Sequence, residues 1–160
     1  WVMEQLQILS LEIQRMPKNP QHEFGHLWEY PLRSVCTIST HDMATLRGWW
    51  EEDKEVTTNY YNHVLGHWGE VPPTAPGNIC EEIIRQHLQC PSLLCILSFQ
   101  DWLSMDEELR YPDAQAERIN VPANPRHYWR YRMHLTIEDL MKKAKFNDKL
   151  REMIDETNRY

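Results

Sequence analysis

Short apolar runs alternate with segments of helical periodicity along most of the chain. Three runs rich in β-branched and aliphatic residues, each bounded by turn-forming or polar residues, are typical of buried parallel strands. They cover approximately residues 7–12, 35–39 and 93–99. Apolar residues spaced three and four apart predict helices between and after these runs. The helices cover approximately residues 60–69, 78–89, 137–145 and 148–158.

The sequence also marks the inner faces and the starts of these helices. The helix at 60–69 is expected to bury Tyr60, Tyr61, Val64, Leu65 and Trp68. The helix at 78–89 is expected to bury Ile79, Ile83, Ile84 and Leu88. Thr136, with Asp139 three residues on, and Asn147 are residue types that cap helix N-termini. The last two helices are therefore expected to begin directly after Thr136 and Asn147.

Strands that alternate with helices, without hairpin turns between them, predict parallel strands in βαβ order. A closed (β/α)8 barrel needs eight strands. The chain is therefore expected to have an α/β fold that is part of a TIM barrel, namely its C-terminal three strands and helices. Residues 1–160 are then the C-terminal part of the catalytic barrel domain, with no complete second domain. Because the chain starts with Trp1 rather than Met, it is expected to be a piece of a longer protein.

A partial barrel leaves one face of its sheet uncovered. We expect Val35, Ile38, Leu93 and Ile96, or their neighbours, to line that face. In the whole protein the rest of the parent barrel would cover it. The isolated 160 residues are therefore expected to self-associate and to be catalytically inactive.

Composition and charge argue against several classes of partner. With 24 acidic and 17 basic residues the net charge is −7, which disfavours a nucleic-acid partner. No apolar run reaches the roughly 18 residues of a membrane span, so no membrane association is expected. The four cysteines form no close C-x-x-C pair and are interpreted as free thiols in a reducing compartment, which favours a cytoplasmic location. They are Cys36, Cys80, Cys90 and Cys95.

The candidate site lies where the second predicted strand ends, at Thr40-His41-Asp42. A carboxylate beside an imidazole, with aromatic rings at Trp49-Trp50 just downstream, suits a sugar site. The carboxylate opposes developing positive charge, the imidazole bonds a hydroxyl, and flat rings cover a pyranose. On these residues alone a second interpretation is the commoner one, in which Asp42 caps a helix and the tryptophans belong to the core.

The segment THDMATLRGWW at 40–50 resembles the Thr-His-Asp segment of the 4-α-glucanotransferases (amylomaltases and disproportionating enzymes, glycoside hydrolase family 77). LSLEIQRMP at 9–17 and AERINVPANPRHYWRYRMHL at 116–135 match the same family in the expected order. The resemblance covers nearly the whole chain and is closer to the branch of the plant cytosolic enzymes. The short bacterial enzymes usually carry Gly-Thr-His-Asp-Asn, where this chain has Ser39 and Met43 at the two ends.

The resemblance implies a retaining transfer of α-1,4-glucan segments, from a maltooligosaccharide, starch or glycogen donor to the 4-hydroxyl of an acceptor sugar. Asp42 would be the catalytic acidic residue that stabilises the charged transition state, while the nucleophile and the acid/base lie outside these residues. His41 would bond sugar hydroxyls, and Asn120 is a candidate substrate contact. No cofactor and no metal are implied. The alternative is a non-catalytic glucan-binding or interaction module.

Two histidine pairs have the spacing of metal sites. His22 and His26 belong to an H-E-x-x-H pattern, which binds zinc when it lies on a stable helix. Gly25 and the flanking prolines disfavour such a helix, so the segment is interpreted as a loop-to-helix turn. His63 and His67 are interpreted as a partly exposed polar stripe on the helix at 60–69.

Two other features have a structural and a functional interpretation. Glu12 ends the first predicted strand and suits a general acid, but the resemblance places that role in a Glu-Asp-Leu-Gly segment that the chain lacks. Glu12 is therefore assigned a structural or substrate-shaping role. The basic and aromatic residues 126–132 have the pattern of an RNA-binding patch. The acidic net charge favours packing of the barrel's closing segment instead.

Overall fold

The computed structural model describes residues 1–129 and 131–159. Its centre is a parallel sheet in the order β1 (Ser10–Ile13), β2 (Ser34–Thr37) and β3 (Leu94–Cys95). Glu12, Cys36 and Cys95 are aligned across the three strands. The predicted parallel order is confirmed, although β3 is much shorter than the run at 93–99. The end of the predicted run is not strand, because α5 (Phe99–Leu103) begins there. The Ser98 hydroxyl caps this helix by accepting a hydrogen bond from the Asp101 amide.

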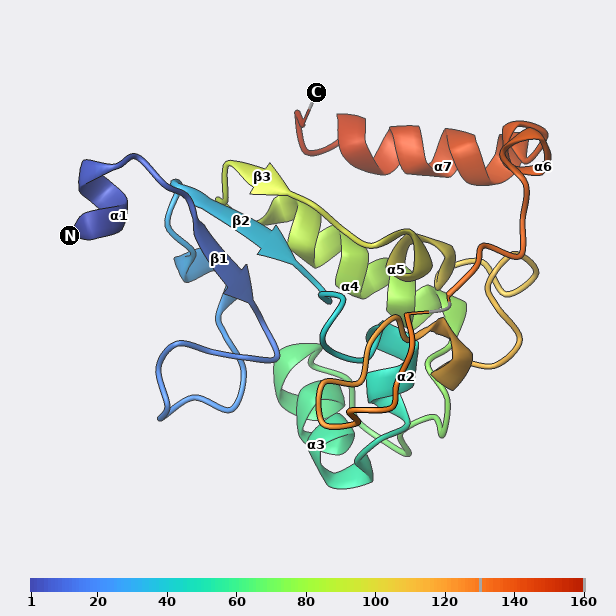
Figure 1. The fold of residues 1–160 in the computed structure, drawn as a ribbon, viewed down its shortest axis with the longest axis horizontal. Coiled ribbons are helices and arrows are strands. Elements are labelled where there is room, and N and C mark those ends of the chain that lie inside the picture. The colour runs from blue at the N-terminus through green and yellow to red at the C-terminus, as the bar shows by residue number, and fades with distance from the viewer. Residues whose placement is uncertain (130, 160) are drawn as a thin grey trace.

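Figure 1 shows α4 (Gly77–Gln89) behind the sheet, and α2 (Leu46–Trp50) and α3 (Lys54–Asn59) beyond the carboxyl ends of the strands. The α-helices are α1 (Val2–Gln5), α2 (Leu46–Trp50), α3 (Lys54–Asn59), α4 (Gly77–Gln89), α5 (Phe99–Leu103), α6 (Ile137–Met141) and α7 (Ala144–Asp155). Two 3-10 turns, η1 (Leu27–Glu29) and η3 (Gln115–Glu117), and the π-helical turn η2 (Tyr60–Val64) complete the elements. Among the described residues, no helix has the length and apolarity that crossing a bilayer requires.

The helix predicted at 78–89 is confirmed as α4. Its four predicted inward residues are all in the main hydrophobic core, which also holds Ile38, Leu46 and Trp50 from the segment between β2 and α3. Figure 1 shows α4 against the sheet, and the buried residues of α4 recur at helical spacing along one face. The core therefore supports the segment that carries the candidate site.

The helix predicted at 60–69 is wrong in its second half. The chain continues from α3 into η2 and leaves the helix before Gly66, which has a φ of +73°. A positive φ is incompatible with a right-handed helix. Trp68 consequently lies outside the helix and is 78% exposed, whereas Tyr60 is buried as expected.

The last two predicted helices are present with different boundaries. The Thr136 hydroxyl accepts a hydrogen bond from the Asp139 amide at 3.1 Å, so Thr136 caps α6 as predicted. Asn147 is not a cap, because α7 already begins at Ala144 and the Asn147 amide group donates to the Leu140 carbonyl at 2.8 Å. Asparagine often caps helix N-termini, but the Asn147 side chain forms its hydrogen bond with the preceding helix α6 instead.

The face of the sheet expected to be uncovered does expose large apolar side chains. Leu93 and Ile96 are more than half exposed, and Leu11 lies opposite Val35 in register. Ile38 does not belong to this face, since it is only 2% exposed and packs in the main core. Side chains alternate along an extended chain, so Ile38, three positions after Val35, points to the opposite face, whereas Val35, Thr37 and Ser39 line the same groove.

Candidate functional site

The loop from β2 to α2 carries Thr40, His41 and Asp42 at the carboxyl end of the sheet. Its local shape comes from the Thr40 side chain, whose hydroxyl accepts a hydrogen bond from the Asp42 amide at 3.3 Å. The His41 and Asp42 side chains are 55% and 53% exposed. Both are thus presented to solvent from a loop whose ends are anchored in the core.

The three site residues predicted from the sequence lie together. Asn120 Nδ2 donates to Asp42 Oδ1 at 2.6 Å, across 78 positions of the chain. His41 Nε2 lies 3.1 Å from Asp42 Oδ2. Each carboxylate oxygen therefore has a nitrogen partner, and the two partners hold the Asp42 carboxylate in a defined orientation.

The exposed aromatic ring beside the site is Trp129, not the Trp49-Trp50 pair. The His41 and Trp129 rings have centroids 5.1 Å apart. Trp50 is buried in the core, and its indole nitrogen donates to the Pro72 carbonyl at 2.9 Å. Trp50 therefore belongs to the core and does not cover a sugar, and Trp49 is partly buried and packs against the same core. Nothing in the local spacing pointed to Trp129, which is 88 residues beyond His41.

Arg15, from the LSLEIQRMP segment, closes the base of the candidate loop. One guanidinium nitrogen, Nη2, donates to the carbonyls of Ile38 and Ala44, at 2.9 Å each. The guanidinium also lies over the Trp49 ring, 4.9 Å from its centroid. Burial lowers the pKa of Arg15. By joining two carbonyls on either side of His41 and Asp42, Arg15 fixes the width of the loop.

Asp101 anchors the same loop from α5. Its carboxylate accepts from the Leu46 amide and the Ser98 hydroxyl, both at 2.8 Å, and from the Ser39 hydroxyl. The residue that caps α2 is Thr45, whose hydroxyl accepts from the Gly48 amide at 3.3 Å. Asp42 is therefore not a helix cap, and the competing structural interpretation of that residue is wrong.

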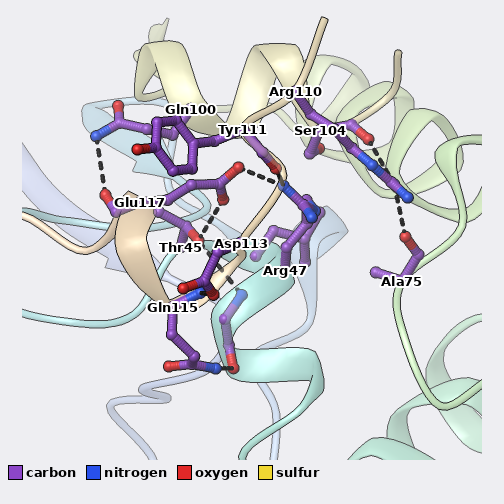
Figure 2. A network of polar contacts seen from close by, with 12 residues as sticks. Thr45, Arg47, Ala75, Gln100, Ser104, Arg110, Tyr111, Asp113, Gln115 and Glu117 are labelled. Atoms are coloured by element: carbon purple, nitrogen blue, oxygen red, sulfur yellow. Dashed lines mark hydrogen bonds and ion pairs between the residues drawn. The ribbon is translucent and has the colours of Figure 1, made fainter. Parts of the chain in front are cut away.

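A second buried network, drawn in Figure 2, joins α2 to the segment that carries Asn120. Glu117 is 1% exposed and accepts from Arg47 Nη1 at 2.5 Å and from the Thr45 hydroxyl at 3.0 Å. The Gln100 side chain donates to the Glu117 carbonyl at 3.2 Å. Burial raises the pKa of Glu117, while the Arg47 charge acts in the opposite direction. The network fixes the chain three residues before Asn120.

Arg118 completes the support of Asn120. Its Nε donates to the Asn120 carbonyl at 2.9 Å, and its Nη1 lies 3.0 Å from Glu52 Oε1. Farther along, a His127 ring nitrogen lies 3.0 Å from the Ile119 carbonyl oxygen. Residues 118–129 thus form a folded loop beside Asp42, held by hydrogen bonds at both ends.

A groove of ≈ 280 Å³ opens beside the Asp42 loop. His41, Thr45 and Ser98 contribute polar groups to it, and Val35 and Ile96 contribute apolar surface. A groove with an apolar floor and a few polar groups is typical of small-molecule sites. It extends from the uncovered face of the sheet toward His41.

Glu12 lies on the other face of the sheet from this groove. Side chains alternate along a strand, so Glu12 faces away from the groove that its neighbour Leu11 lines. The Glu12 carboxylate accepts from the Ser10 hydroxyl at 2.6 Å and pairs with Lys18. These contacts agree with a structural role.

In the part of the chain that the structure covers, no cluster of three or more His, Cys, Asp or Glu residues could hold a metal ion. His22 and His26 stack on each other, with ring centroids 4.7 Å apart, in the loop before η1. His63 Nδ1 lies 3.2 Å from the Asn59 carbonyl oxygen, and His67 Nε2 lies 2.7 Å from Glu82 Oε2. The basic segment 126–132 includes Arg130, which lies outside the described residues.

The chain matches known proteins along most of its length. The profile of the family described as 4-alpha-glucanotransferase matches residues 1–136. The 4-alpha-glucanotransferase DPE2 of Oryza sativa subsp. japonica is 37% identical over 158 residues, which are 99% of this chain and 17% of that protein. The 4-alpha-glucanotransferase of Chlamydia trachomatis is 30% identical over 125 residues, 76% of this chain and 23% of that protein.

A solved structure shares the fold. The amylomaltase from Streptococcus agalactiae, in complex with acarbose, superposes with a TM-score of 0.70 at 20% sequence identity. The match covers 99% of this chain and 29% of that chain. This agrees with the predicted three strands and helices of a (β/α)8 barrel. The chain therefore spans only a minor part of each of these relatives.

Proposed function

The chain belongs to the 4-alpha-glucanotransferase family, glycoside hydrolase family 77, and we propose that it forms the C-terminal part of the catalytic barrel of such an enzyme. The whole protein transfers segments of α-1,4-glucan from a donor to the 4-hydroxyl of an acceptor sugar, with retention through a glucosyl-enzyme. The observation that carries the proposal is the contact of His41 and Asn120 with the two oxygens of Asp42 at the carboxyl end of the sheet.

The position of Asp42 supports an electrostatic role. In (β/α)8 enzymes the loops at the carboxyl ends of the strands carry the chemistry. The transition state of glycoside transfer resembles an oxocarbenium ion, so a carboxylate held close to the sugar ring stabilises its positive charge. Asn120 donates a hydrogen bond without adding charge, which orients Asp42 while leaving its negative charge in place. The nucleophile and the acid/base belong to the rest of the barrel.

The surroundings of Asp42 fit a sugar. The His41 imidazole is exposed and can exchange hydrogen bonds with hydroxyl groups, and the neighbouring Trp129 ring is 57% exposed. An aromatic face packs well against the apolar face of a pyranose. The acarbose bound to the Streptococcus agalactiae amylomaltase agrees with a carbohydrate ligand. Starch, glycogen or maltodextrins are the glucans that this chemistry serves.

We also propose a partner for the exposed face of the chain and a cellular location for the protein. The rest of the parent barrel covers the apolar face exposed at Leu93 and Ile96, and the isolated 160 residues self-associate through that face. The four cysteines are all unpaired thiols, which supports a reducing, cytoplasmic location. The reaction uses no cofactor and no metal, because carboxylates carry retaining glycoside chemistry.

The test uses the full-length parent protein with maltotriose as the only sugar. Transfer releases glucose and lengthens the remaining oligosaccharides, and Asp42→Asn removes most of this activity. Asp148→Asn is the matched control, because Asp148 is an exposed carboxylate on α7 paired only with Arg151 in the described structure. Binding of maltotriose without any transfer by the parent would refute the proposal and favour a non-catalytic glucan-binding module.

A further inference from the structure

Three of the four cysteines form a cluster on the face of the sheet opposite the groove beside His41. Cys36 of β2 and Cys95 of β3 are partners in register, and Cys90 lies between α4 and β3. The side chains of Cys90 and Cys95 both lie beside Cys36, and both act on the pKa of the Cys36 thiol. Cys36 and Cys90 also pack in one small buried cluster with Leu27 and Tyr30. Two thiols packed in one small cluster are the starting point for a disulfide.

Arg159 lies against Cys90 from the segment after α7. Its Nη2 is 3.8 Å from Cys90 Sγ and also donates to the Cys90 carbonyl, while its Nε donates to the Leu88 carbonyl at 2.6 Å. These backbone contacts hold the guanidinium at the sulfur. A cation and a thiol donor beside one sulfur favour its thiolate form.

The two thiols of the pair are electronically different. The hydrogen bond from Cys36, followed by bonds to Ser92 and the charge of Arg159, lowers the pKa of Cys90 to about 6. The same hydrogen bonds, together with burial, raise the pKa of Cys36 far above its ordinary value. Cys90 is therefore the nucleophile, and Cys36 is the neighbouring thiol that keeps its proton.

A groove gives small oxidants a path to Cys90. Cys90, Cys95 and Arg159 line a groove of ≈ 700 Å³ around the start of β3, between the ends of α4 and α7. Cys90 is 5% exposed, whereas Cys36 is fully buried beneath it. A thiolate that lines a groove open to solvent and lies beside a second thiol has the pattern of peroxide-sensitive cysteines. Cys80, by contrast, is fully buried in the main core, and burial raises its pKa to about 11.

We propose that Cys90 and Cys36 form a reversible, peroxide-driven disulfide, separate from the glucan site. The Cys90 thiolate attacks one oxygen of hydrogen peroxide, which breaks the O–O bond, forms a sulfenic acid and releases hydroxide. The Cys36 sulfur then attacks Cys90 Sγ, and the sulfenic oxygen leaves as water together with the Cys36 proton. Two thiols and one peroxide thus give one disulfide and two waters. The bond joins β2, which leads into the Asp42 loop, to the connection between α4 and β3.

The experiment maps thiols in the full-length protein and does not depend on glucan transfer. The reduced protein is treated with hydrogen peroxide, blocked with N-ethylmaleimide, digested and analysed by mass spectrometry without reduction. The expected product is a cross-linked peptide pair containing Cys36 and Cys90, lighter by about 2 Da for the two hydrogens lost. Dithiothreitol reverses it, and Cys80 stays available for alkylation after denaturation.

Single variants assign the roles of the two thiols. Cys90→Ser removes the cross-link, and Cys36→Ser leaves a Cys90 sulfenic acid that dimedone captures. Cys80→Ser is the matched control, because it removes a thiol outside the cluster and leaves the cross-link unchanged. Arg159→Gln slows alkylation of Cys90 by iodoacetamide at pH 7, since the thiolate loses its cation.

Two results would overturn the proposal without touching the proposed function. One is that Cys36 and Cys90 of the unmodified protein both remain alkylatable after peroxide treatment that oxidises exposed methionines. The other is a cross-link from Cys90 to Cys95 in place of Cys36. Both measurements are made on the wild-type chain, so neither depends on whether a variant folds.

Discussion

The buried Glu117–Arg47 pair allows a quantitative prediction about the loop that carries Asn120. Both side chains are almost completely buried, and their closest atoms are 2.5 Å apart. Glu117→Gln keeps the shape of the side chain but leaves the Arg47 charge buried without its counter-ion. Breaking a buried ion pair by removing one partner typically costs about 3–5 kcal/mol. The new amide oxygen still accepts one hydrogen bond, so the cost is expected at the lower end, about 3 kcal/mol.

This cost should appear as local opening of residues 115–129, because η3 is held to α2 by this pair and by the Gln115 side chain, which donates to the Gly48 carbonyl at 3.0 Å. A loss of about 3 kcal/mol corresponds to roughly 100-fold faster amide exchange in segments that exchange by local opening. Hydrogen-exchange mass spectrometry of the full-length protein measures it peptide by peptide.

Glu107→Gln is the matched control for this experiment. Glu107 is 62% exposed and lies 3.8 Å from Arg110, so the loss of its charge should leave exchange at 115–129 unchanged. Equal exchange of this segment in wild type and Glu117→Gln would refute the reasoning, because it would show that the buried pair does not hold the loop.

Further predictions concern Arg15, the pH dependence of stability and the removal of metal ions. Arg15→Lys keeps the charge but loses the flat guanidinium over Trp49. In the full-length protein kcat for glucan transfer should fall about 10- to 100-fold, with a smaller change in KM. An unchanged kcat would show that Arg15 does not fix the geometry of the loop. Burial lowers the pKa of His87 to about 4, so between pH 6.5 and 4 the unfolded chain binds a proton that the folded chain does not. The free energy of unfolding should therefore fall as the pH is lowered from 6.5 to 4, by about 3 kcal/mol. His87→Gln should flatten this part of the stability profile in urea unfolding, and an unchanged slope would assign it to other groups. Dialysis against a strong chelator should leave transfer unchanged, and a loss restored by zinc would reopen the His22 and His26 interpretation.

The parts of the fold that sequence reasoning predicted well are those with a repeated local signal. The apolar residues of α4 recur at helical spacing and are buried together, and the cap at Thr136 is a local hydrogen bond. The errors occur where a single local feature overrides the pattern. Gly66 ends a helix whose apolar spacing continues to Trp68, and Ser98 starts α5 inside an apolar run.

The candidate site was predictable only in part, for a related reason. The segments around Asp42 and Asn120 were identified through their resemblance to a family, not through any spacing that links them. Arg15, Asp101 and Glu117 were missed as supports, because each reaches partners far away in the chain. Long-range polar networks leave no periodic trace in a sequence, and only the folded structure brings their members together.

We propose that the Asp42 carboxylate stabilises the charged transition state of glucan transfer. The most direct test compares wild-type and Asp42→Asn full-length protein in two measurements made side by side, the rate of maltotriose transfer and the dissociation constant for maltotriose. Loss of such electrostatic stabilisation typically lowers the rate by about 10²- to 10³-fold. We expect that fall, with a dissociation constant changed by no more than about threefold, because the interaction acts mainly in the transition state. An Asp42→Asn enzyme with a near-normal rate, or one whose loss lies entirely in binding, would contradict the claim.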